Sequence, residues 1–241
     1  MKSICSLYKL KMRAVLKSAV LVIPTVMTVA FLGIMYSIMP AHVCGSFLMS
    51  GFFLFAISVY LSMLIQMNEN DVFEEVLFLH SHSTFGYYIA REMVLVSITL
   101  VYTVMLIIYP LIRSSLHHGF FSRPIKPEDV LYGSLILVGS GFCGIALGDL
   151  FHHRIFGRAR FAVMGVILVS ILAVCKLGLA DSFPVLKVLS VITPPIMDGF
   201  KMVGDSDLFD KTGSLIIFAH MLAFSVVSVA IKIRLLKHLK W

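Results

Sequence analysis

Two polar residues within apolar stretches have the side chains that nucleophilic catalysis requires. Ser140 stands between Gly139 and Gly141, and His220 lies in a separate apolar stretch near the end of the chain. A histidine within hydrogen-bond reach of a serine can accept its proton and turn the hydroxyl into a nucleophile. The same residues have a simpler role, because small residues let membrane helices approach closely and a buried histidine can bond a neighbouring helix. We therefore favour packing at Ser140, and keep catalysis as the alternative.

A serine on the fourth apolar stretch and a histidine on the sixth resemble the rhomboid intramembrane serine proteases. In that family the histidine activates the serine, so the resemblance implies a hydrolase that uses Ser140 and His220. The chain departs from the family pattern at Val138, where the rhomboid signature has glycine. The first two apolar stretches are also joined by a short turn rather than by a long loop.

Metal and nucleotide chemistry have weaker support in the sequence. The pairs His117–His118 and His152–His153 are adjacent in sequence, and neighbouring side chains on a helix point in different directions, which makes them poor joint ligands. We assign both pairs to loops at the membrane edge. The chain has no G-x-x-x-x-G-K-[ST] phosphate loop. We expect no catalytic residue, metal site or cofactor in this chain.

The composition indicates that lipid is the solvent for most of the chain. Hydrophobic residues make up 59% of the 241 residues and charged residues 14%, and the mean hydropathy is +0.96. A membrane span needs about 20 mostly apolar residues. Six stretches fit this length or nearly so, which predicts an all-α polytopic protein with a single transmembrane domain over residues 1–241. The stretches are Ala19–Met39, Val43–Gln66, Met93–Ile112, Val130–Leu150, Phe161–Ala180 and Ser214–Ile231.

The positive residues flank these stretches, so the net charge of +7 is a topology signal and does not indicate nucleic-acid binding. If the spans alternate in direction, 13 of the 20 Lys and Arg residues fall on one side. The richer side is cytoplasmic by the positive-inside rule. We therefore expect a multi-pass protein of the cell membrane with both termini in the cytoplasm. Asp149 is expected to pair with Arg154 or Arg158 at the inner surface.

Two segments are amphipathic or broken rather than spanning. Residues 1–17 alternate apolar and basic residues near helical spacing, which predicts a helix in the membrane interface. Residues 181–211, on the outer side, are too broken to span and too apolar for a solvated loop. We expect a re-entrant segment there, with Pro194, Pro195 and Ile196 as an outer gate. The acids at Asp205, Asp207 and Asp210 are expected to form a solvated turn.

The cytoplasmic segment 67–92 is the most informative feature of the sequence. Helical spacing places Val72, Phe73, Val76, Leu77 and His80 on one face. Acidic residues cover the rest of this short helix, and a run of Ser and His follows it. Such a pattern predicts a short helix that lies parallel to the membrane between the second and third spans.

This order of features resembles the type-2 permeases of ABC exporters, with Glu75, Leu77, Phe78, Tyr87, Ala90 and Arg91 at matching places. The resemblance covers the whole chain and implies a permease that receives force from a separate cytoplasmic ATPase. The residues implied in this coupling are Val72, Phe73, Glu74, Glu75, Val76, Leu77 and Arg91.

Such a permease would pair with a second copy or a paralogue. It would export an amphipathic small molecule, drug or peptide, with ATP bound by the partner subunit. A secondary transporter or a membrane scaffold is a further alternative. Few buried acids are evident in the sequence for ion coupling.

Overall fold

The computed structural model describes residues 2–37, 39–68, 77, 84–117, 119–182, 193–201 and 207–238. Within these residues the regular secondary structure is helical, and the one bridge of strand type joins Ala41 to Phe121. The prediction of an all-α fold is therefore confirmed for these residues.

Among the described residues, five helices are long and apolar enough to cross a membrane. They are α3 (Val43–Asn68), α5 (Thr84–Leu116), α6 (Pro127–Leu150), α8 (Ala159–Ser182) and α10 (Lys211–His238). The sequence predicts a sixth span over Ala19–Met39. In the structure a short 3-10 helix η1 (Ala19–Leu21) runs into α2 (Val22–Met35), which ends four residues before Met39.

The first span is continuous with the amphipathic helix α1 (Lys2–Lys17) through a bend of 67°. The count of spans is six only if this bent pair is taken as one span. The third span is predicted to begin at Met93, whereas α5 begins at Thr84. The helix therefore includes the last residues of the predicted loop 67–92.

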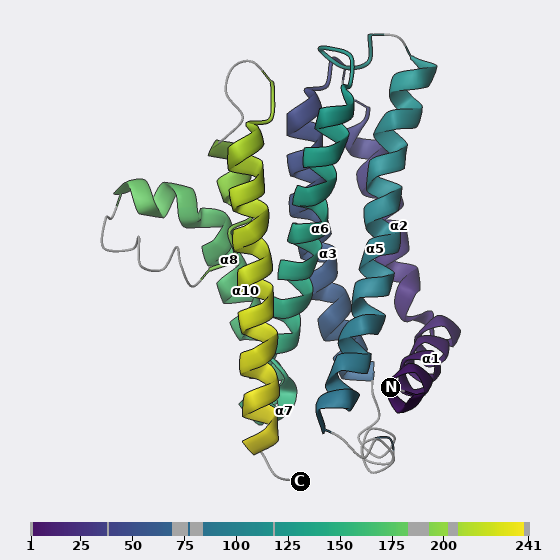
Figure 1. Ribbon diagram of the computed structural model, residues 1–241, viewed down its shortest axis with the longest axis vertical. Helices are drawn as coiled ribbons and strands as arrows, with labels where there is room; N and C mark the ends of the chain where they lie inside the picture. The colour runs from purple at the N-terminus through teal and green to yellow at the C-terminus, as the bar shows by residue number, and fades with distance from the viewer. Residues whose placement is uncertain are drawn as a thin grey trace.

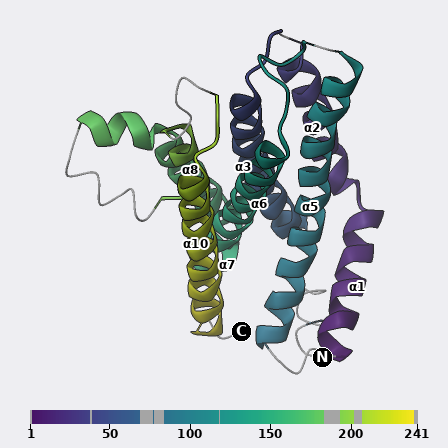
Figure 2. The same ribbon diagram turned by 45° about the horizontal axis from the view of Figure 1, so that its top comes forward.

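The helices are arranged in three groups. In both views α3 and α6 form the centre, α8 and α10 lie on one side, and α5 with α2 lies on the other (Figures 1 and 2). Both termini lie toward the end of the bundle where α5 begins and α10 ends (Figure 1). We call this the termini end and its counterpart the opposite end.

Glycines on α6 allow its tight contact with α3. A Cβ atom added at Gly144 would lie 2.5 Å from the carbonyl oxygen of Phe55, and one at Gly148 would lie 2.8 Å from that of Val59. Backbones that approach this closely gain dispersion contacts that larger residues would prevent. The prediction that small residues of this span serve close helix packing is confirmed.

Helix α1 packs along the first half of α5 at the termini end. Leu7 is buried, Tyr8 shares a hydrogen bond of 3.1 Å with Ser97, and Lys11 donates one of 2.8 Å to the hydroxyl of Tyr87. One face of the amphipathic helix α1 therefore packs against α5.

Asp207 joins the loops of the opposite end. Its carboxylate accepts hydrogen bonds from the backbone N–H groups of Val43 and Cys44 at 2.8 and 2.9 Å, which caps the start of α3. The Nε atom of Arg123 donates to the Asp207 carbonyl oxygen at 2.9 Å. Arg123 also forms a bidentate pair with Asp129, which raises the pKa of its guanidinium above the usual range. The expectation of a solvated acidic turn is therefore wrong for Asp207, which is buried.

Candidate functional site

Four ionisable side chains meet inside the bundle near its termini end. The Nη2 atom of Arg91 lies 3.1 Å from Oδ1 of Asp149, and both side chains are at most 1% exposed. The Nζ atom of Lys232 lies 2.9 Å from Oε1 of Glu92 and also contacts Oδ2 of Asp149. We call Arg91, Glu92, Asp149 and Lys232 the buried ion network.

Polar residues from two further segments surround the network. Gln66 of α3 donates through Nε2 to Oδ1 of Asp149 at 2.9 Å and to the carbonyl oxygen of Gly148 at 3.2 Å. The Nε2 atom of His152 lies 3.0 Å from Nη1 of Arg91. His152 lies in the short connection between α6 and the helix α7 (His153–Phe156), as predicted for a loop residue, but its ring is fully buried.

Electrostatics explains why these groups cluster. An isolated charge inside a membrane protein is expensive, so such residues pair with one another and often mark functional sites. Two cations and two carboxylates balance in formal charge here. Because the members come from α5, α6 and α10, with Gln66 added from α3, the network ties four helices together at one level.

Asp149 has two cationic partners that the sequence did not indicate, Arg91 and Lys232. Of the two partners that the sequence predicted, Arg158 is exposed, and the side chain of Arg154 lies outside the described part of the structure. Lys232 also counts as a tail residue by sequence, whereas it is fully buried within α10. The sequence did contain a signal for buried ion pairs, because Glu92 and Lys232 each border an apolar stretch that is long enough to span. Charge alone could not tell which helix ends would meet.

The predicted coupling residues are only partly within the described structure. Val72, Phe73, Glu74, Glu75 and Val76 lie outside the described residues. Leu77 is buried among Leu7, Tyr87, Tyr88, Ala90 and Leu236. Arg91 is 1% exposed and belongs to the buried ion network. Both side chains therefore contact this chain itself rather than its surroundings.

The predicted outer gate lies in a buried stretch of the opposite end. Pro194, Pro195 and Ile196 are buried and precede the 3-10 helix η3 (Met197–Lys201). Asp198 of η3 accepts a hydrogen bond of 2.8 Å from Lys176 of α8. Residues 183–192 and 202–206, about half of the predicted re-entrant segment, lie outside the described residues.

Ser140 and His220 are not joined in the way that catalysis needs. A Cβ atom added at Gly51 of α3 would lie 3.2 Å from Oγ of Ser140. Among the described residues, this buried Oγ atom has no hydrogen-bond partner. The neighbouring Gly139 is instead the residue that faces α10, because a Cβ atom there would meet Met221 and Phe218. Ser140 thus lies on the α3 side of its helix.

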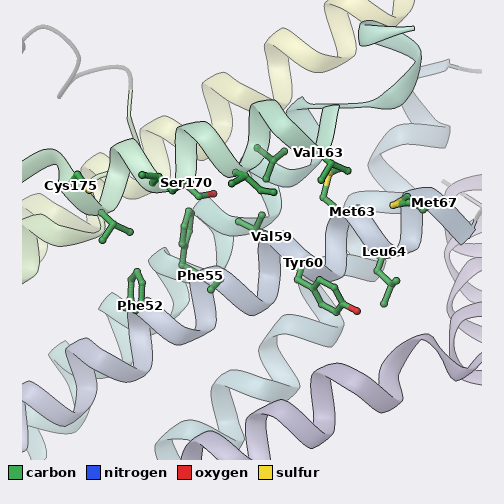
Figure 3. Close-up of a pocket in the computed structure, with 15 residues that line it drawn as sticks. Phe52, Phe55, Val59, Tyr60, Met63, Leu64, Met67, Val163, Ser170 and Cys175 are labelled. Carbon is green, nitrogen blue, oxygen red and sulfur yellow. The ribbon is translucent and has the colours of Figure 1, made fainter. Parts of the chain in front are cut away.

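Two apolar grooves run along the membrane-spanning part of the bundle. The larger, about 500 Å³, lies between α3 and α8. In Figure 3 the side chains of Phe55 and Val59 extend from α3 toward α8, and Ser170 lies on the α8 side. None of the described residues that line this groove is charged. The second groove, about 410 Å³, lies between α5, α6 and α10 and has Glu92 among its lining residues.

Comparison of the chain with family models, with curated proteins and with solved structures gave no match. The case for a function therefore rests on the residues and their arrangement.

Proposed function

We propose that this chain is the permease subunit of an ATP-driven ABC exporter in the cell membrane. Both termini are cytoplasmic in this proposal, and a second permease copy or a paralogue completes the membrane part. A separate ATPase subunit binds ATP and contacts the segment around Val72–Leu77. The cargo is an amphipathic small molecule, drug or peptide.

The observation that carries the proposal is the position of the buried ion network. The helix α5 follows directly on the predicted coupling segment, and its early residues Arg91 and Glu92 pair with α6 and α10. A force applied to the segment would reach α5 first. Because buried pairs are costly to break singly, the load would then pass through Arg91–Asp149 and Glu92–Lys232 to the other helices.

Burial of Leu77 supports the same path. This side chain packs against Tyr87 and Tyr88 of α5 and against Leu7 of α1. An apolar anchor of this kind fixes at least one point of the segment to the start of α5. A partner that moves the segment would therefore move α5 with it.

The test is purification with the ATPase and reconstitution. The tagged chain is purified in mild detergent, the accompanying ABC ATPase is identified, and both are placed in proteoliposomes. We expect Phe73→Ala to lower the affinity for the ATPase about fivefold or more, since truncating a buried anchor commonly costs more than about 1 kcal/mol. The matched control is Leu116→Ala at the far end of α5, where the side chain is 67% exposed.

A purified chain that carries no ABC ATPase under mild conditions would contradict the proposal. If the Phe73→Ala variant binds the ATPase normally and supports normal ATP-driven transport, the docking site is wrongly placed, but the exporter function still stands.

One observation favours a second candidate, an ion-coupled secondary transporter. Two carboxylates, Glu92 and Asp149, are buried within spanning helices, although the sequence analysis finds few acids for such coupling. Buried acids of this kind serve as ion and proton sites in transporters. Uptake or efflux in vesicles that responds to an ion gradient, with no ATPase present, would favour this candidate over the exporter.

A further inference from the structure

The groove between α5, α6 and α10 differs from the larger groove in its chemistry. Its walls are mostly apolar, and Glu92 is the only charged residue among the described residues that line it. The Glu92 side chain is 11% exposed. Since Glu92 lines the groove and lies within a spanning helix, its carboxylate forms part of a surface that is otherwise apolar.

The ion pairs are unevenly shared between the two carboxylates. Asp149 contacts both Arg91 and Lys232, whereas Glu92, among the described residues, is paired with Lys232 alone. Lys232 would therefore keep an anionic partner in Asp149 if Glu92 turned to another cation. Glu92 is therefore the carboxylate of the network with the fewer cationic partners among the described residues.

Aromatic rings lie on two walls of the same groove. Phe85 of α5 is 60% exposed, and Phe142 of α6 lines the groove together with residues of α10 that include Val229 and Ala230. Aromatic faces attract cations whose charge is poorly hydrated. A volume of about 410 Å³ is also within the usual range of small-molecule pockets, roughly 300–1,000 Å³.

We propose that this groove binds an amphipathic organic cation with a delocalised charge, with the cationic centre at Glu92 and the apolar part along α5 and α10. A compact ammonium ion would lose too much hydration on entry, because the cost of dehydrating a small ion in an apolar site is large. A delocalised cation with apolar substituents carries a much smaller cost. The binding site itself does not depend on the proposed exporter function. The identification of this ligand as the class of exported substrate rests on that proposed function.

The test uses tetraphenylphosphonium as the probe and the purified full-length chain in nanodiscs, without any ATPase. Saturable binding is measured by equilibrium dialysis of the radiolabelled ion. We expect Glu92→Gln to weaken binding at least tenfold. The matched control Glu128→Gln removes an exposed carboxylate at the opposite end and should leave the affinity unchanged.

A second variant leaves the ion network intact. Ala230→Phe adds bulk to an exposed position of the groove wall and should also weaken binding at least tenfold. Neutral triphenylphosphine oxide should compete poorly, because it lacks the charge that Glu92 attracts.

Binding of equal strength in the wild type, Glu92→Gln and Ala230→Phe would overturn the proposal, as would the absence of saturable binding to the wild type. Binding is measured without a motor, so its failure says nothing about ATPase association. Conversely, if the probe binds at Glu92 but no ABC ATPase accompanies the purified chain, the binding site is supported and the exporter function is contradicted.

Discussion

Arg91 and Asp149 form an ion pair across 58 positions of sequence, with 3.1 Å between Nη2 and Oδ1 and almost no exposure of either side chain. Lys232 approaches the same carboxylate from α10, and Gln66 bonds it from α3. Asp149 is thus the point at which α3, α5, α6 and α10 meet.

Replacing Asp149 with Asn should destabilise the protein strongly. The change leaves Arg91 without its carboxylate and Lys232 with Glu92 alone, and removing one partner of a buried pair typically costs about 3–5 kcal/mol. The measurement is unfolding in detergent micelles, followed by circular dichroism against denaturant. The control is Glu128→Gln, which breaks an exposed pair with Lys211 and should not change stability measurably. Equal stability of the two variants would show that the network contributes little.

Adding a methyl group at Gly144 should separate α3 from α6. The new Cβ atom would lie 2.5 Å from the carbonyl oxygen of Phe55, and overpacking of this kind costs about 1–3 kcal/mol. At Gly33, on α2, an added Cβ meets nothing within 4 Å, so Gly33→Ala should be neutral or slightly stabilising. Comparing the denaturation midpoints of the two variants tests this, and similar midpoints would contradict the close packing.

Removal of the Asp207 side chain should loosen the opposite end. Asp207→Ala deletes the acceptors for the Val43 and Cys44 N–H groups, and loss of such a cap costs about 0.5–2 kcal/mol. The buried Cys44 thiol, which lies 3.2 Å from the Asp207 carbonyl oxygen, should then react faster with a membrane-impermeant maleimide.

The labelling needs a background in which the exposed Cys5 and Cys175 are serine. Cys143, buried between α6 and α10, is the internal reference and should stay unlabelled. An unchanged rate at Cys44 would show that Asp207 does not hold this end closed.

Ser140→Ala should leave function and stability nearly unchanged. Among the described residues the Ser140 hydroxyl has no hydrogen-bond partner, so its removal leaves no other group unsatisfied. Ser225→Ala provides a contrast, because the Ser225 hydroxyl donates to the carbonyl oxygen of Met221 at 2.8 Å. Activity is followed as transport in vesicles. Loss of a proteolytic activity in Ser140→Ala would instead identify this residue as a nucleophile.

Reporter fusions at Lys2 and at Trp241 should both give a cytoplasmic signal. The expectation rests on the excess of Lys and Arg on one side of the predicted spans, 13 of 20. The ends of the described chain lie toward the same end of the bundle (Figure 1). A signal from outside at either terminus would exclude the proposed orientation.

The all-helical class of this protein and most of its helices can be predicted from the amino-acid pattern alone. Runs of about 20 apolar residues are long enough to cross a bilayer, and in lipid the backbone must satisfy its own hydrogen bonds, which leaves helices as the structure for such runs. The glycines of Val130–Leu150 likewise indicated close packing in advance. Element limits were less certain, as the start of α5 at Thr84 shows.

The pairing of the charged residues depends on how the helices pack and cannot be predicted from the pattern of any one segment. Arg91, Asp149 and Lys232 are far apart in sequence, and each could by composition belong to a membrane-edge flank. They come together because the glycine contacts set the approach of α3 to α6 and the packing of α5 and α10 sets the level of each side chain. Hydrophobic patterning is a property of one segment, whereas ion pairing between helices depends on the rotation and depth of several segments at once.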